Sequence, residues 1–440
     1  MGFHPTYGGA RRGVGRLLPV VLPLLVTAPL APPAAPPVAI VDVRLLPMDG
    51  SGPRDSQSVL IEGDRIRWVG SASDLAAPEG ALVVDGRGRT LMPGLADMHV
   101  HLNREDLDTY LAFGVTTVRN MWGFPDAWVM RGEIERGEIL GPAIHLVSSG
   151  LDGTPPKWPL TQLVMDPTVA DSVVEVQRRA GYTTLKVYQD LRAEPYDSIV
   201  AAARRRGMDF VGHVPHRVGL ERVLASGQRS LEHLSGYLEE LTLVGGRGPR
   251  AWVRTRSERI PALAAATEAA GAWVCPTLTI AHRLGRALPA DERDASRANR
   301  GAMVRALHRA GAGLLVGSDA GIEVVDPGAS LHDELEEFVA AGIPPLEALR
   351  MATAGAAEFL GQVGEFGVIA PGARADLLLL DRDPLEDLGA LEAPAGVMVR
   401  GRWFREPDPL PNRVRPREGL NPPAASPPAR ASADGRAPTR

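Results

Sequence analysis

The sequence contains very little cysteine and very little lysine. Its 440 residues include one cysteine, Cys275, which excludes an internal disulfide and any metal cluster built from several thiolates. The net charge of −5 gives no argument for binding nucleic acid or an anionic membrane. A hydrophobic content of 44% and this length indicate a globular chain, large enough for a barrel-sized domain and a smaller one.

The two ends of the chain differ in composition from its middle. A basic stretch, ARRGVGR, precedes an apolar run at residues 17–30 that has the length of a signal-peptide core. This run is too short and too rich in proline for a transmembrane helix. We therefore expect residues 1–37 to be a signal peptide and a Pro/Ala linker, and the protein to be exported without stable membrane association. Residues 405–440, rich in Pro, Ala and Arg, are expected to be a disordered tail.

Short β-branched runs alternate with helical stretches over residues 93–360. The strand-like runs are LADMHVH (95–101), VTTVRN (115–120), AIHLVSS (143–149), TTLKVY (183–188), FVGHVP (210–215), SLEHLS (230–235), WVCPTLT (273–279) and LLVGSDA (314–320). Helical stretches such as 171–181 and 195–207 end on glycine, the usual C-cap. Eight strands with helices between them predict an α/β fold, a (β/α)8 TIM-type barrel.

Residues 38–92 and 361–404 have a different pattern. Both contain strand runs that are interrupted by glycine and aspartate, and neither is large enough to bury a core alone. We therefore expect the two segments to pair into one small β-sandwich domain, built from both ends of the chain around the barrel.

Polar side chains recur where the predicted barrel strands end. Residues two apart in a strand face the same side, so His99 and His101 both point into the barrel. A single histidine in a strand is usually structural. Here six side chains that can bind metal converge on the carboxyl ends of the strands, where barrel enzymes place their active sites. They are His99, His101, Lys186, His213, His233 and Asp319.

Lys186 is unusual because the chain contains 48 Lys and Arg residues but only two lysines, Lys157 and Lys186. Arginine is always protonated, whereas a buried amine can be neutral and can react. The reaction that fits a metal centre is addition of CO2, which would give a carbamate that bridges two metals.

The joint motif set resembles the metal-dependent amidohydrolase superfamily, on the imidazolonepropionase-like and Xaa-Pro-dipeptidase-like branch. The motifs are HVH (99–101), Lys186, GHVP with His213, LEHL with His233 and GSDAG with Asp319, within a likeness that runs from about residue 38 to 404. In binuclear members, the resemblance assigns His99, His101 and Asp319 to one ion and His213 and His233 to the other. A carboxylated Lys186 would bridge two divalent ions, with zinc as the expected metal.

The resemblance also implies an activity. We expect an exported amidohydrolase that cleaves a C–N bond of a small amide, cyclic amide or dipeptide through a hydroxide that bridges the metals. Asp319 would be the catalytic residue that accepts the proton from water and returns it to the leaving nitrogen. The expected partner is a small-molecule substrate, and the sequence is compatible with either a monomer or an oligomer.

Four further residues are candidate substrate contacts. His145 lies on the third predicted strand, and Tyr188 and Tyr237 follow strands that end in candidate ligands. Trp158 lies in the segment SGLDGTPPKWP, which lacks the Gly/His-rich loop that many dipeptidase-like relatives carry here. This departure leaves the dipeptidase substrate open and makes Trp158 a candidate wall of an apolar pocket.

Two alternatives remain at this point. A mononuclear deaminase of the same superfamily would not need Lys186, so metal content would separate it from a binuclear hydrolase. A catalytically inactive binding protein on the same scaffold would be expected to have lost ligands, and none of the six is missing here.

Overall fold

The computed structural model describes residues 36–322 and 324–405. The predicted signal peptide and the predicted tail therefore lie, apart from their innermost residues, outside the described part of the chain. Over the described ranges, no helix is both long enough and apolar enough to cross a bilayer.

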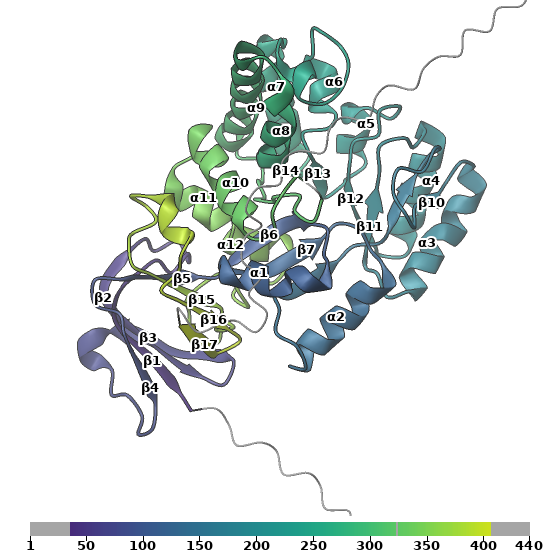
Figure 1. The fold of residues 1–440 in the computed structure, drawn as a ribbon. Helices are drawn as coiled ribbons and strands as arrows, with labels where there is room; N and C mark the ends of the chain where they lie inside the picture. Colours follow the sequence, from purple (N-terminus) through teal and green to yellow (C-terminus); the bar gives the residue numbers. More distant parts are fainter. Residues whose placement is uncertain (1–35, 323, 406–440) are drawn as a thin grey trace, which may run out of the picture. The chain divides into compact units, whose positions relative to one another are not determined.

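Strands from the two ends of the chain pair in one sheet (Figure 1). The strand order is β17-β16-β15-β5-β1-β2-β3, and β4 pairs with β1. The register sets Leu378 opposite Met92, where the two chain ends meet in antiparallel β15 and β5. The strands are β1 (Val38–Leu45), β2 (Arg54–Glu62), β3 (Arg65–Ser71), β4 (Leu82–Asp85), β5 (Thr90–Pro93), β15 (Leu377–Leu380), β16 (Gly396–Val399) and β17 (Arg402–Arg405).

The core of this sheet draws on both chain ends. Ile40 and its cross-strand partner Val59 are fully buried and belong to the same apolar cluster as Leu377, Leu379 and Met398. Because each segment supplies only part of these contacts, neither would bury them without the other. The predicted pairing of the two ends is thus observed, as one hydrogen-bonded sheet. Its arrangement as a sandwich remains a prediction.

Parallel strands and helices alternate along the middle of the chain. One sheet has the order β6-β7-β8 and the other β10-β9-β11-β12-β13-β14. The strands are β6 (Leu95–Val100), β7 (Val115–Asn120), β8 (Ala143–Leu146), β9 (Gly150–Asp152), β10 (Gln162–Leu163), β11 (Thr184–Val187), β12 (Asp209–Gly212), β13 (Ser230–Glu232) and β14 (Trp273–Cys275).

Backbone hydrogen bonds connect the two parallel sheets at both sides. Ser148 N donates to Thr184 O at 2.9 Å, which joins the chain after β8 to β11. On the other side, Leu315 N donates to Val274 O at 2.9 Å and Met98 N donates to Val316 O at 2.9 Å. The hydrogen-bonded path that starts at β6 therefore returns to β6.

Two segments differ from the sequence-based expectation. The predicted strand at 314–320 forms only single bridges, among them Val274–Leu314 and Val100–Ala320, although it occupies the expected place beside β14 and β6. Residues 150–152, expected to belong to a loop, form β9 because Lys186 and Val187 of β11 offer backbone partners to Gly150 and Leu151.

Helices surround the parallel strands (Figure 1). The predicted helices at 171–181 and 195–207 are confirmed as α3 and α4, and Gly181 and Gly207 follow them at positive φ. The helices are α1 (Leu107–Ala112), α2 (Pro125–Glu135), α3 (Ala170–Arg179), α4 (Ala193–Arg205), α5 (Leu220–Ala225), α6 (Tyr237–Leu241), α7 (Ile260–Ala269), α8 (Leu278–Leu284), α9 (Ala290–Ala310), α10 (Ala329–Ala340), α11 (Pro345–Met351) and α12 (Ala354–Phe359).

Candidate metal centre

Asp319 lies among three of the predicted histidines. Its Oδ1 is 3.1 Å from His101 Nε2 and 3.4 Å from His99 Nε2, and its Oδ2 is 3.8 Å from His233 Nδ1. The carboxylate stands at the carboxyl end of β6, because Asp319 N donates to His99 O at 2.8 Å. A residue 218 positions after His101 is thus brought into contact with it.

The four histidines form a continuous row. Ring centroids are 5.6 Å apart for His101 and His99, 4.5 Å for His99 and His233, and 4.6 Å for His233 and His213. Ligand atoms of His99, His233 and Asp319 lie within 4.8 Å of one another. The buried Nε2 of His99 has no hydrogen-bond partner. A buried ring nitrogen without a partner, facing other imidazoles and a carboxylate, fits a divalent metal ion.

A buried network holds His99 from its other side. Its Nδ1 lies 2.7 Å from Oε2 of Glu232, and Arg119 donates to Oε1 of the same carboxylate at 3.1 Å. Arg119 also donates to Met98 O at 2.6 Å, and Ser230 Oγ donates to Glu232 at 2.5 Å. Burial raises the pKa of Glu232, but Arg119 and Lys186 outweigh it and hold the pKa below its ordinary value. An ionised Glu232 would keep the proton of His99 on Nδ1 and leave Nε2 free for a metal.

Asp97 ties β6 to the turn that carries Asp319. Its Oδ1 accepts hydrogen bonds from Ser318 N at 3.0 Å and His99 N at 3.2 Å, and its Oδ2 accepts one from Ser318 Oγ at 2.5 Å. Burial raises the pKa of Asp97 to about 7. Asp97 thus fixes the spacing between the HVH segment and Asp319.

Lys186 is buried in β11. Burial lowers its pKa to about 8, although Glu232 and Asp319 act in the opposite direction. Within the ranges that the structure describes, no ion pair joins its ammonium to a carboxylate. A buried ammonium without a paired anion is costly, so the site favours a form of this side chain that is not cationic.

The strand ends at the cluster adopt unusual backbone conformations. His233, Asp319 and Thr277 have φ values of 62°, 62° and 47°, in the left-handed region that side chains other than glycine rarely adopt. Such conformations gather at functional sites, where surrounding contacts enforce them. Here Thr277 Oγ1 lies 2.8 Å from His233 Nδ1, so the turn after β14 orients that imidazole.

The turn of Thr277 is held by Glu334 of α10. Glu334 is fully buried and accepts hydrogen bonds from Leu278 N at 2.8 Å and Thr279 N at 2.7 Å, one on each carboxylate oxygen. Burial raises the pKa of Glu334 to about 8, despite these two donors. Glu334 thus supports the turn, and the turn contacts His233. These contacts were not predicted from the sequence.

Two of the four predicted substrate contacts lie at the cluster. The Tyr188 ring packs against His213 at a centroid distance of 4.2 Å, and the Trp158 ring lies 6.3 Å from that of His101. Trp158 Nε1 donates to Tyr188 Oη at 2.8 Å. Burial raises the pKa of Tyr188 to about 12, so its hydroxyl keeps its proton at neutral pH.

The structure places the other two candidates in packing roles. His145 stacks on Phe366 at 6.3 Å, and burial lowers its pKa to about 4. Tyr237 is fully buried, and its hydroxyl lies 2.7 Å from Thr267 Oγ1, between α6 and α7. We therefore propose no substrate contact for either.

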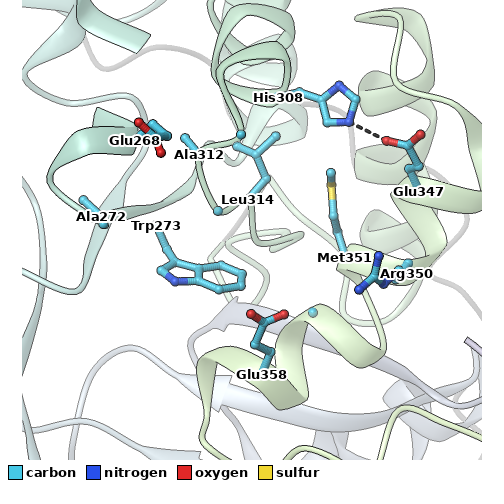
Figure 2. Close-up of a pocket in the computed structure, with 14 residues that line it drawn as sticks. Glu268, Ala272, Trp273, His308, Ala312, Leu314, Glu347, Arg350, Met351 and Glu358 are labelled. Carbon is cyan, nitrogen blue, oxygen red and sulfur yellow. Dashed lines mark hydrogen bonds and ion pairs between the residues drawn. The ribbon is translucent and has the colours of Figure 1, made fainter. Parts of the chain in front are cut away.

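A separate cavity of about 600 Å³ lies at the amino end of β14, and none of the six candidate metal ligands lines it (Figure 2). The Trp273 indole faces it, and His308 and Glu347 pair across its edge at 2.5 Å. Because Trp273 begins β14 and the Thr277 turn follows its end, this cavity is not part of the candidate metal centre.

Comparison with known proteins shows the family of the chain. A sequence profile of the amidohydrolase family matches residues 90–404, which include all six predicted ligands. Ochratoxinase of Aspergillus niger is 26% identical over 433 residues, covering 82% of this chain and 85% of the relative. Imidazolonepropionase of an Arthrobacter species is 51% identical over 45 residues, 10% of this chain and 11% of the relative.

A solved structure shows the same fold. A Xaa-Pro dipeptidase with bound methionine superposes with a TM-score of 0.68 at 20% identity, covering 84% of this chain and 100% of that one. The family profile covers most of the chain and the whole of the candidate centre. The chain belongs to the amidohydrolase family, hydrolases that act on carbon–nitrogen bonds, as its histidine, lysine and aspartate motifs predict.

Proposed function

We propose that this protein is a binuclear metal-dependent amidohydrolase that cleaves the C–N bond of a small amide, cyclic amide or dipeptide. The observation that carries the proposal is the buried Nε2 of His99, which has no hydrogen-bond partner and faces the carboxylate of Asp319. Three more imidazoles adjoin this point in one row. Such a donor set suits zinc or a similar divalent ion.

Two ions would divide the donors between them. His99, His101 and Asp319 would hold one ion, and His213 and His233 the other. Lys186, carboxylated on Nζ, would bridge them. Its burial without an ion pair supports this, because a carbamate replaces the unpaired positive charge with an anion that two cations stabilise.

The chain supplies the remaining groups for hydrolysis. Bound divalent ions would make water more acidic and polarise the substrate carbonyl. Asp319 would accept the proton of the attacking water and deliver it to the leaving nitrogen. Tyr188, which keeps its proton at neutral pH, would donate a hydrogen bond to a substrate oxygen.

The proposed architecture is a (β/α)8 barrel over residues 93–360, beside a composite β-sandwich of residues 38–92 and 361–404. The hydrogen-bonded path that returns to β6 supports the barrel, and the antiparallel pair β5 and β15 supports the union of the chain ends. Limited proteolysis at the two junctions of the barrel should leave residues 38–92 and 361–404 associated with each other, and their separation without denaturant would argue against the composite domain.

A mononuclear deaminase is the alternative enzyme. It would not explain why a lysine without an ion pair is buried in β11. The two proposals separate on metal content: two ions per chain for the binuclear hydrolase and one for the deaminase. An inactive binding protein would show neither turnover nor a stoichiometric metal requirement.

The decisive experiment combines metal analysis with a substrate screen. The purified chain is freed of metal, reconstituted with Zn, Mn or Co, and tested against N-acyl amino acids, Xaa-Pro dipeptides and lactams. We expect two ions per chain and hydrolysis that disappears on chelation. Full activity in the metal-free protein would refute the proposal.

Export is a further part of the proposal, and it rests on the basic-then-apolar pattern of residues 10–30. Mass spectrometry of protein from the exported fraction should show loss of about the first 30 residues. Intact Met1 on protein confined to the cytoplasm would contradict it.

A further inference from the structure

Trp158 exposes a large aromatic surface beside the candidate metal centre. It follows β9 in the chain and keeps 44% of its surface accessible. Its ring is inclined by only 21° to the imidazole of His101, with the centroids 6.3 Å apart. An exposed indole forgoes the free energy that burial of its apolar surface would provide. Its exposure beside a candidate ligand therefore indicates a functional role.

Hydrogen bonds fix this indole in spite of its exposure. Trp158 Nε1 donates to Tyr188 Oη at 2.8 Å, and Trp122 Nε1 donates to the next carbonyl, Pro159 O, at 2.9 Å. The Tyr188 ring in turn packs edge-on against Trp122 at 5.4 Å. The loop is thus attached at two points, through Trp158 to Tyr188 directly after β11 and through Pro159 to Trp122 after β7.

An indole that is fixed in this way is preorganised for ligand binding. A side chain that is already immobile loses little conformational entropy when a ligand covers it. Because the indole N–H is used by Tyr188, the remaining accessible surface of Trp158 is apolar. A planar apolar group is the ligand chemistry that complements such a ring.

The same hydrogen bond constrains Tyr188. Since Tyr188 Oη accepts from Trp158, its own proton remains free to be donated to another oxygen. The Tyr188 ring lies against His213 at the candidate centre. A group bound on Trp158 and an oxygen bound by Tyr188 would therefore belong to one substrate.

The exposed surface continues along the loop. Leu160, Leu163 and Met165 expose 53%, 42% and 40% of their surfaces. The loop thus combines a fixed ring next to the ligands with apolar side chains beyond it.

We propose that Trp158 determines substrate class: it receives a planar aromatic group attached directly to the scissile amide, so that N-aroyl compounds are preferred over N-acetyl ones. The inference rests on the proposed amidohydrolase function. Because the Trp158 ring lies only 6.3 Å from that of the candidate ligand His101, a ring that stacks on Trp158 would adjoin the amide carbonyl directly.

The test compares three acyl groups on the same amino acids: acetyl, cyclohexanecarbonyl and benzoyl. Cyclohexanecarbonyl matches benzoyl in size but is not flat. For the metal-loaded wild type, we expect kcat/KM for benzoyl to exceed that for acetyl by roughly tenfold or more, and to exceed that for cyclohexanecarbonyl.

Variants assign the preference to the ring. Trp158→Ala should reduce the benzoyl-to-acetyl ratio by about tenfold, whereas Trp158→Phe, which keeps a flat ring, should retain most of it. Trp403→Phe in β17 is the matched control and should keep the wild-type ratio. Isothermal titration of N-benzoyl ligands into metal-free protein provides a second readout, in which binding weakens for Trp158→Ala only.

The outcomes distinguish the two proposals. Amide hydrolysis with an unchanged acyl preference in Trp158→Ala would overturn the role of Trp158 and leave the amidohydrolase function standing. Absence of any amide hydrolysis by the metal-loaded wild type would overturn both.

Discussion

The imidazole of His99 and the carboxylate of Glu232 are joined by a buried contact of 2.7 Å between Nδ1 and Oε2. The two residues are 133 positions apart and lie on β6 and β13. Arg119 completes an ion pair with the same carboxylate at 3.1 Å. The carboxylate thus has two tasks: it orients a candidate ligand and it neutralises a buried guanidinium.

Glu232→Gln should therefore weaken metal binding and destabilise the fold together. The amide no longer favours the tautomer of His99 that leaves Nε2 free, and loss of such a supporting contact typically lowers metal affinity 10–100-fold. Arg119 would also remain buried without its anion, at a cost of about 3–5 kcal/mol in unfolding free energy. Metal titration and thermal unfolding measure the two effects.

Ser230→Ala is the control for Glu232→Gln. It removes a hydroxyl that contacts both Arg119 and Glu232 but leaves the ion pair and the contact with His99 in place. We expect a stability loss of about 1–3 kcal/mol with near-normal metal affinity. Equal metal affinity in the wild type and a folded Glu232→Gln would show that Glu232 does not position His99.

Lys186→Arg should lose at least one metal ion and nearly all activity while the protein stays folded. Arginine cannot form a carbamate, and its fixed charge would face two divalent ions. At about 4 Å, each such repulsion is roughly 4 kcal/mol at an effective dielectric near 20. Metal stoichiometry, turnover and circular dichroism are the measurements, and added acetate should partly restore Lys186→Ala.

The only other lysine provides a matched control for Lys186. Lys157 exposes 38% of its side chain and pairs with Asp190 at 3.5 Å. Lys157→Arg keeps an exposed ion pair and should leave metal content unchanged. Two ions and normal turnover in Lys186→Arg would remove the bridging carbamate and favour the mononuclear alternative.

The sequence located the candidate ligands because each of them ends a recognisable strand run. Parallel strands in an alternating α/β pattern bring their carboxyl ends together, so convergence of His99, His213 and Asp319 follows from the order of elements alone. The residues behind the ligands were missed. Arg119 and Glu232 were visible as charged residues inside strand runs, but nothing local tells which partner each one contacts.

Glu232 shows why local pattern was insufficient. Alternation along a strand predicts that Glu232 and His233 face opposite sides. In the structure His233 adopts φ of 62°, which breaks the alternation and turns its ring toward His99. A left-handed residue other than glycine depends on contacts such as Thr277, which lies 44 positions away, so no local signal marks it.

Asp319→Asn should reduce turnover more than metal content. The amide can still offer its carbonyl oxygen to an ion but cannot accept and return a proton, so kcat should fall on the order of 10²–10⁴-fold. Metal analysis of the variant separates the two effects. Asp326→Asn, at a carboxylate that exposes 72% of its side chain, is the control and should match the wild type. A near-normal rate in metal-loaded Asp319→Asn would assign the proton transfer to another group.

Glu334 should make stability depend on pH. Its pKa is raised from 4.5 to about 8 because burial disfavours the ionised form. The folded state therefore holds this proton more tightly than the unfolded state. The stabilising contribution is complete below about pH 4.5 and is lost as the pH rises through about 8, at up to about 1.4 kcal/mol per pH unit.

Glu334→Gln removes this titration. The variant carries an NH2 group, which cannot accept, in place of one of the two oxygens that meet Leu278 N and Thr279 N, so it should be less stable than the wild type near pH 5. Because only the wild type loses stability on deprotonation of this group, the difference in unfolding free energy should shrink between about pH 5 and pH 8. Denaturant unfolding across this range measures it, with the exposed Glu358→Gln as control. Parallel pH profiles for wild type and Glu334→Gln would mean that Glu334 stays ionised when the protein folds, and that its two backbone donors outweigh its burial.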